Sequence, residues 1–136
     1  MAKWSIPMST VTAKMKTQAE VATKQVTYQV LKAVVVRSPV GNPSLWQSPA
    51  PAGYVGGRFR ANWNVSQGSP NVAVTKSTSG SRADSEVRKA LSFKPGGIVY
   101  LTNALPYARD LEYGYSTQAP SGMVRLAVAA IKAGFK

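Results

Sequence analysis

The side chains that could carry out acid–base or metal chemistry are few in this sequence. The chain of 136 residues contains no histidine and no cysteine, so imidazole bases, thiolate nucleophiles and thiolate zinc sites are excluded. Five carboxylates remain: Glu20, Asp84, Glu86, Asp110 and Glu112. Asp110 and Glu112 are two positions apart, which puts them on different faces of a helix and argues against an acid–base pair. We therefore expect no catalytic residue, no metal site and no cofactor, and a protein that is not an enzyme.

Polar and apolar residues alternate between positions 58 and 66. The apolar set is Phe59, Ala61, Trp63 and Val65, and the polar set is Arg58, Arg60, Asn62 and Asn64. A period of two predicts a half-buried strand with its apolar set in the core. Arginine can bond a phosphate with two donors without reading base sequence, so the polar set is a candidate DNA-facing surface. The alternatives are ion pairs with Glu112 or Asp110, in the same or a neighbouring subunit, and exposure to solvent.

This strand needs neighbours, and the sequence predicts two. Residues 71–75 place Val72 and Val74 on one face and follow a turn-forming Gly68-Ser69-Pro70, which predicts an antiparallel hairpin with residues 58–66. Residues 98–102 predict a further strand.

A long helix is predicted near the N-terminus. An apolar stripe recurs at helical spacing between residues 14 and 37. It comprises Met15, Ala19, Ala22, Val26, Val30, Ala33 and Val34. Residues 1–13 are expected to be irregular, with Thr12 as the candidate N-cap.

Short helices are predicted further along the chain. Ser81 and Asp84 form a capping-box pattern before a short amphipathic segment. Pro106 fits the first position of another helix, which would turn Leu111 toward the core and end at Gly114.

The predicted order is helix, hairpin, helix, strand, helix and a C-terminal helix at 123–135. Covering helices mixed with a small antiparallel sheet indicate the α+β class. We expect a long N-terminal helix, a mostly antiparallel sheet of three or four strands, short helices and the C-terminal helix. The length favours a single domain over residues 1–136.

Residues 38–57 form a loop rich in proline and glycine. A connection of about 20 residues is unusual inside a compact domain and is often functional. Trp46 and Tyr54 lie in it, and two interpretations are open. Either both rings fold back and pin the loop, or they anchor an arm that docks on a neighbour, because aromatic side chains often anchor interfaces.

The charge is strongly basic. Lys and Arg number 17 and Asp and Glu number 5, which gives a net charge of +12. This balance favours a polyanionic or acidic partner, although the same charge also promotes solubility. The sequence has no apolar run long enough for a transmembrane helix and no secretory signal, so we expect no membrane contact. The absence of cysteine favours assembly in a reducing cytoplasm.

Several short motifs follow one another in order between residues 14 and 130. They are Ser38-Pro39-Val40, Gly57-Arg58-Phe59-Arg60-Ala61-Asn62-Trp63, Asn103-Ala104-Leu105-Pro106-Tyr107-Ala108, Glu112-Tyr113-Gly114, Gln118-Ala119-Pro120 and Gly122-Met123-Val124-Arg125. The ordered set resembles the tail-completion or neck proteins of tailed bacteriophages, the family of minor tail protein Z and its relatives. The insertion between Val40 and Gly57 is longer than in many members.

The resemblance implies structural work rather than catalysis. Such proteins form a ring, usually a hexamer, at the head-to-tail junction, where they help a finished tail join a DNA-filled head. The implied protein is a virion component assembled in the host cytoplasm. Its implied partners are further copies of itself, the head–tail connector and the tail terminator or tube proteins, with non-specific contact to genomic double-stranded DNA in the lumen. A ring of subunits that each have a net charge of +12 carries more positive charge than the phosphates of the DNA in its lumen can neutralise. We therefore expect much of this positive charge to face acidic neighbouring proteins.

Exposed aromatic residues and one carboxylate complete the expectations. The candidate subunit or partner interface comprises Trp46, Tyr54, Tyr107, Glu112, Tyr113 and Tyr115. Two alternatives to the neck ring stay open: a tail terminator that caps the tail tube, and a free, basic nucleic-acid-binding module. The charge fits the second alternative, but the sequence carries no recognised binding motif for it.

Overall fold

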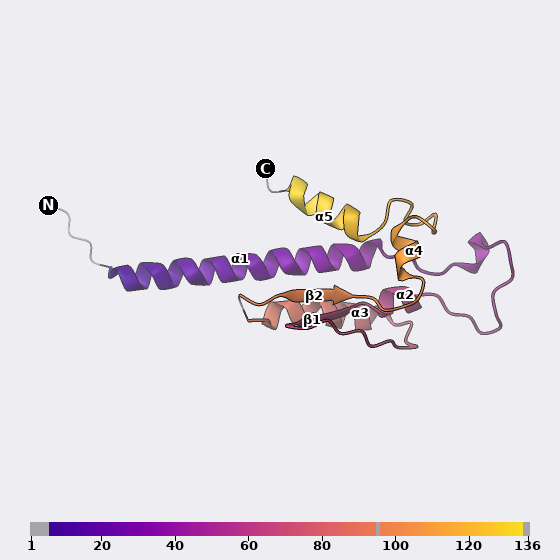
Figure 1. Cartoon of the computed structure of the whole chain (residues 1–136), viewed down its shortest axis with the longest axis horizontal. Coiled ribbons are helices and arrows are strands. Elements are labelled where there is room, and N and C mark those ends of the chain that lie inside the picture. Colours follow the sequence, from indigo (N-terminus) through magenta and orange to yellow (C-terminus); the bar gives the residue numbers. More distant parts are fainter. Residues whose placement is uncertain (1–5, 95, 135–136) are drawn as a thin grey trace.

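The computed structural model describes residues 6–94 and 96–134. Its elements, in chain order, are α1 (Met8–Arg37), the 3-10 turn η1 (Pro43–Leu45), α2 (Arg58–Ala61), β1 (Asn64–Gln67), α3 (Gly80–Arg88), the 3-10 turn η2 (Lys89–Ser92), β2 (Val99–Thr102), α4 (Ala108–Glu112) and α5 (Val124–Ala133). Helices and a small antiparallel sheet are mixed, so the α+β class is confirmed (Figure 1). Across the described residues the sheet has two strands, fewer than the three or four expected.

The long helix α1 begins earlier than its apolar periodicity predicts. It starts at Met8, so the expectations of irregular structure over 8–13 and of an N-cap at Thr12 are wrong, while residues 1–5 lie outside the described residues. Two threonine hydroxyls in this part of the helix bond carbonyls one turn back, which satisfies their donors. Thr12 donates to Met8 O at 3.0 Å and Thr17 to Ala13 O at 3.0 Å. Satisfied in this way, threonine is tolerated inside a helix.

Only the C-terminal part of α1 is covered by the rest of the chain. Figure 1 shows the sheet and α3 on one side of it and α5 on the other, while the N-terminal part extends beyond them. Leu31, Val34 and Val35 are buried, whereas Met15, on the predicted apolar stripe, is 64% exposed. The stripe is therefore a core face over one half of the helix and an uncovered face over the other.

The strand predicted at 58–66 is wrong over its first half. Residues 58–61 form the single helical turn α2, entered through Gly57 in the left-handed region at φ 113°, and the strand starts only at Asn64. The spacing of four between Phe59 and Trp63 suits a helical turn as well as a strand. Their rings pack edge to face with centroids 5.7 Å apart.

The predicted hairpin partner is also different. β1 pairs antiparallel with β2, with Asn64 opposite Thr102 and Gln67 opposite Val99, which confirms the strand expected at 98–102. Residues 71–75 form no strand. The pairing therefore joins segments about 35 residues apart in sequence, and the predicted hairpin of neighbouring strands is wrong.

The core lies where α1, α3, α5 and the sheet meet. Phe59, Trp63 and Val65 are 5%, 6% and 2% exposed, and Leu111 is half-buried against the same cluster. Met123, just before α5, is fully buried. A cluster that joins residues from both ends of the chain fixes how α1 and α5 lie relative to the sheet.

The shorter helices differ in detail from their sequence signals. α3 begins at Gly80, so Ser81 and Asp84 lie inside it and the predicted capping box is not formed. α4 begins at Ala108, so the prediction of Pro106 at its first position is wrong; Pro106 lies in the turn before the helix. The chain turns after α4 at Gly114, with φ 92°. The C-terminal helix is confirmed as α5, although residues 135–136 lie outside the described residues.

Candidate functional site

The four residues predicted to form one polar face do not share one. Asn62 and Asn64 are fully buried, whereas Arg58 is exposed and Arg60 is half-buried. The expectation of an exposed, DNA-facing stripe of all four is therefore wrong. The helical turn α2 breaks the alternation over residues 58–61, and the segment 71–75 covers Asn62 and Asn64.

Asn62 and Asn64 serve as backbone partners for the segment 71–75. The Asn62 side chain pairs with Thr75 in both directions: its Nδ2 donates to Thr75 O at 3.0 Å, and Thr75 N donates to its Oδ1 at 2.8 Å. Asn64 Nδ2 donates to Ala73 O at 2.7 Å. Buried amides thus replace the strand ladder that the sequence predicted for this segment.

Three arginines hold backbone carbonyls instead of pairing with Glu112 or Asp110. Arg60 Nη2 donates to Ser38 O at 2.7 Å and Val36 O at 3.2 Å, next to the C-terminal end of α1. Arg58 Nε donates to Thr75 O at 3.3 Å. Arg82, which the sequence did not single out, donates to Asn64 Oδ1 at 2.8 Å and to Ala61 O. Part of the positive charge is therefore used inside the fold.

Glu112 caps α5 from a distant part of the chain. Its carboxylate accepts hydrogen bonds from the backbone amides of Met123 (2.9 Å), Val124 (3.0 Å) and Arg125 (3.1 Å), and forms an ion pair with Arg125 Nε at 3.3 Å. Burial alone would raise the pKa of Glu112, but these donors together lower it below its usual value. The carboxylate satisfies amides that a helix start leaves without partners.

Glu86 has a comparable structural role in α3. Its Oε2 accepts from Val65 N at 3.0 Å, and its Oε1 pairs with Lys89 Nζ at 2.7 Å and Arg82 Nη2 at 4.0 Å. Burial opposes ionisation here too, but Lys89, the Val65 amide and Arg82 outweigh it and lower the pKa of Glu86. Within the described residues, no group of three or more acidic side chains could hold a metal ion.

Three of the predicted interface tyrosines, Tyr107, Tyr113 and Tyr115, flank α4. Tyr113 and Tyr115 are 67% and 85% exposed, and Tyr113 lies between the guanidinium groups of Arg109 and Arg125, with centroid distances of 5.8 and 5.1 Å. Tyr107 packs against Phe59 and its pKa is raised, chiefly by burial. The tyrosines are therefore accessible to a partner, and their interface role stays a prediction.

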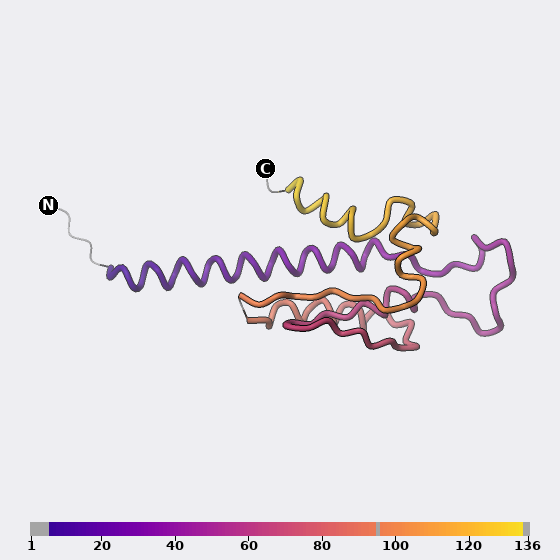
Figure 2. The backbone as a smooth tube through the Cα atoms, viewed as in Figure 1, coloured from indigo at the N-terminus to yellow at the C-terminus, as the bar shows by residue number. Residues whose placement is uncertain are grey.

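Residues 42–55, between Gly41 and Gly56, form a projection that we call the arm. Figure 2 shows the chain leaving the end of α1, making this excursion away from the body and returning to α2. The two glycines close its base, because a Cβ on Gly56 would collide with Gly41 O. Gln118 fixes the entry, accepting from Val40 N at 3.1 Å and donating to Val40 O at 2.7 Å.

The arm carries the two aromatic residues that the sequence singled out, Trp46 and Tyr54. The rings of Trp46 and Tyr54 pack edge to face with centroids 4.8 Å apart, and Tyr54 also lies against Gly41. Both interpretations of the loop thus find support in its geometry: the rings pin the arm internally, yet Trp46 remains 41% and Tyr54 38% exposed. Leu45 and Val55 are exposed as well.

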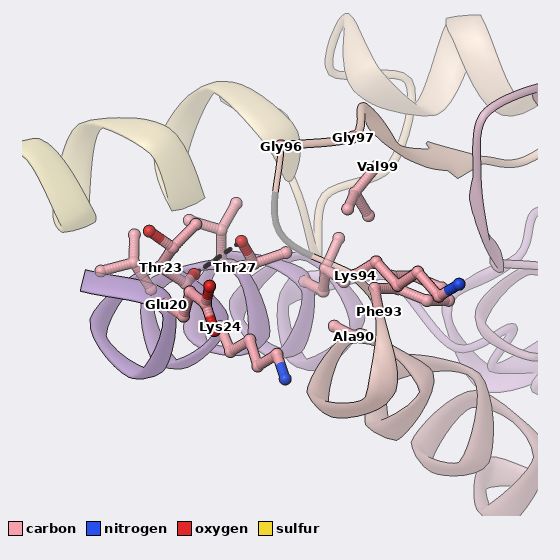
Figure 3. A pocket seen from close by; sticks show the side chains of 13 residues that line it. Glu20, Thr23, Lys24, Thr27, Ala90, Phe93, Lys94, Gly96, Gly97 and Val99 are labelled. Carbon is pink, nitrogen blue, oxygen red and sulfur yellow. Dashed lines mark hydrogen bonds between the residues drawn. The ribbon is translucent and has the colours of Figure 1, made fainter. Parts of the chain in front are cut away.

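A groove of about 390 Å³ lies between α1 and the segment 90–99. Its walls are mostly apolar, with Val26, Val30 and Leu31 on α1 and Phe93 and Val99 opposite. Figure 3 shows these two walls, with Lys24 on the helical side and Lys94 on the other. No local sequence pattern indicates this groove, because its two walls come from segments about 60 or more residues apart.

Comparisons with known proteins add no identification. No family model, curated protein or solved structure matches this chain. Among the described residues, no helix has the length and apolar character needed to cross a membrane.

Proposed function

We propose that this chain is a structural subunit of the head-to-tail junction of a tailed bacteriophage, one copy of a ring that joins a finished tail to a DNA-filled head. The observation that carries the proposal is the arm. Its base is fixed, and along its length it exposes Leu45, Trp46, Tyr54 and Val55 in the isolated chain. Apolar side chains gathered on one projection are typical of a surface that another protein covers.

The motifs behind the resemblance support the proposal through their contacts. Trp63 Nε1 donates to Ser38 Oγ at 2.8 Å, Arg60 donates to Ser38 O, and Glu112 caps residues 123–125. These residues hold elements together rather than line a pocket. Such roles favour a shared architecture over a shared active site, and with it a protein that is not an enzyme.

Light scattering and negative-stain imaging of the purified protein, alone and mixed with phage tail tubes, test the proposal. We expect rings, or caps at one end of the tubes. The variant Leu45→Ala should weaken the association. Val72→Ala truncates another exposed apolar side chain, outside both the arm and the groove, and should leave the association unchanged. A wild-type protein that stays monomeric and ignores the tubes would overturn the proposal.

The same images address the alternative of a tail terminator. A terminator caps tubes in the absence of heads, whereas a neck protein is required when completed tails are joined to filled heads. In vitro joining of heads and tails with and without the protein therefore separates the two roles.

One observation favours a second candidate, a nucleic-acid-binding module. The uncovered part of α1 carries Lys14, Lys16 and Lys24 with Glu20 as its acidic residue. A monomer that binds duplex DNA at physiological salt would support this role. The logarithm of its binding constant should fall with the logarithm of the salt concentration, with a slope of about −0.9 for each phosphate contacted. Replacing these three lysines by glutamate should then abolish DNA binding.

A further inference from the structure

We infer that the arm of one copy docks into the groove between α1 and residues 90–99 of a second copy. The inference rests on the proposed ring and names the two surfaces that would join its subunits. A contact between two different surfaces can repeat from copy to copy, and it closes into a ring where the rotation permits.

The arm lies too far from the groove of its own chain to fill it. The groove lies along Glu20 to Leu31, whereas the arm starts beyond Arg37. At 1.5 Å per residue, Arg37 lies about 9 Å beyond Leu31, the near end of the groove, and about 20 Å beyond Lys24. Figures 1 and 2 show the arm extending away from the body at the end opposite the uncovered part of α1. An arm that fills this groove must therefore belong to another copy.

Size and polarity of the two surfaces agree. The groove volume of about 390 Å³ falls in the range of about 300–1,000 Å³ that is typical of binding pockets. The walls are apolar, and the arm presents Trp46, Tyr54, Leu45 and Val55. Aromatic side chains each bury about 150–250 Å², a substantial part of the roughly 800 Å² that each partner contributes to a stable interface.

Charge favours the arm over other parts of a second copy. Two chains of net charge +12 repel one another, and α1 of a second copy would bring its own lysines toward Lys24 and Lys94. Residues 38–57 contain no charged side chain, so the arm approaches without this repulsion. Its aromatic rings also offer faces to which the two ammonium groups are attracted.

Disulfide trapping tests the contact directly, because the native chain has no cysteine. One variant carries Gln47→Cys on the arm and the other carries Thr23→Cys at the groove; both positions are exposed. Mixed under mild oxidation, the two variants should form mostly the mixed disulfide dimer. The matched control pairs Gln47→Cys with Gln25→Cys, which is exposed on the same helix but does not line the groove.

A non-covalent measurement complements the trapping. Thr23→Arg places a long, charged side chain at the groove and should shift self-association to lower mass in light scattering, whereas Gln25→Arg adds the same charge outside it and should not. Equal trapping at positions 23 and 25, or equal masses for the two arginine variants, would overturn the inference.

The outcomes also separate this inference from the proposed function. A protein that caps tails or joins them to heads but shows no selective trapping keeps the function and loses the arm–groove contact. Selective trapping in a protein that ignores tails and heads keeps the contact and removes the phage role.

Discussion

The indole Nε1–H of Trp63 donates a hydrogen bond to the hydroxyl of Ser38, 2.8 Å away, inside the core. Ser38 in turn donates to Val34 O at 2.8 Å, at the end of α1. This short chain of bonds ties the longest helix to the residue that precedes β1. Both residues belong to the motifs that resemble phage neck proteins, and the contact gives them a physical reason to occur together.

Trp63→Ala should lower the free energy of unfolding by roughly 3–5 kcal/mol, because it removes a large buried ring and the bond to Ser38. Urea denaturation measures the change. Trp46→Ala is the matched control, since that ring is 41% exposed on the arm, and it should change the stability by less than about 0.5 kcal/mol. Similar losses in both variants would contradict the assignment of Trp63 to the core.

Glu112→Gln should destabilise the protein by about 1–2 kcal/mol, because a neutral amide is a weaker acceptor for the three amides that start α5. The loss should appear in urea denaturation and as faster amide exchange at residues 123–125. Asp84→Asn, an exposed change in α3, is the control and should have little effect. An unchanged stability in Glu112→Gln would show that the cap contributes nothing.

Stability should fall on acidification. The folded-state pKa values of Glu86 and Glu112 are lowered from 4.5, so their stabilising contribution is present above that pH and is lost as pH falls through the folded values. Urea midpoints from about pH 7 to about pH 3 should therefore decrease below about pH 4.5. The decrease should be smaller in the double variant Glu86→Gln/Glu112→Gln, and an identical profile in that variant would contradict the role of these two groups.

Asn62→Ala should destabilise the fold without changing any affinity for DNA. It leaves the Thr75 amide without its acceptor and removes one of the two donors to the Thr75 carbonyl, at a cost of about 1–3 kcal/mol. Arg58→Ala, at an exposed position, should have a smaller effect on stability. Urea denaturation and salt-dependent DNA binding on both variants test this contrast. Weaker DNA binding by a stably folded Asn62→Ala would restore Asn62 as a contact residue.

Replacing residues 43–55 by a two-residue glycine linker should preserve the fold and abolish assembly. The bases of the arm at Gly41 and Gly56 are already in contact, so a short linker can close the gap. Circular dichroism and the melting temperature should match the wild type, while rings and tail caps should disappear. Normal assembly of the shortened chain would contradict a docking role for the arm.

The sequence predicted those elements whose signal is local and periodic. The stripe of α1, the apolar strand at 98–102 and the periodicity of α5 were recognisable because each repeats within its own segment. Residues 58–66 were misassigned because Phe59 and Trp63 suit a helical turn as well as a strand, and only the surrounding packing decides between them.

The remaining features depend on contacts that no local pattern encodes. Glu112 caps a helix that begins twelve positions later, and Asn62 replaces a strand partner for Thr75 across a loop. A carboxylate before a helix or an asparagine in a strand-like stretch gives no sign of such a partner. The candidate DNA-facing residues Asn62 and Asn64 were misplaced for this reason, whereas the loop at 38–57 followed from its proline- and glycine-rich composition.

The touching backbones at Gly41 and Gly56 make the arm an exchangeable module. Because its ends already meet, lengthening the segment between them costs little closure entropy, about 0.6 kcal/mol for each doubling. Insertions and sequence changes at the tip can therefore accumulate while the body keeps its stability. Substitutions in this one loop could therefore change which neighbour the subunits bind during evolution. A tag or fluorescent reporter could be inserted at the same place.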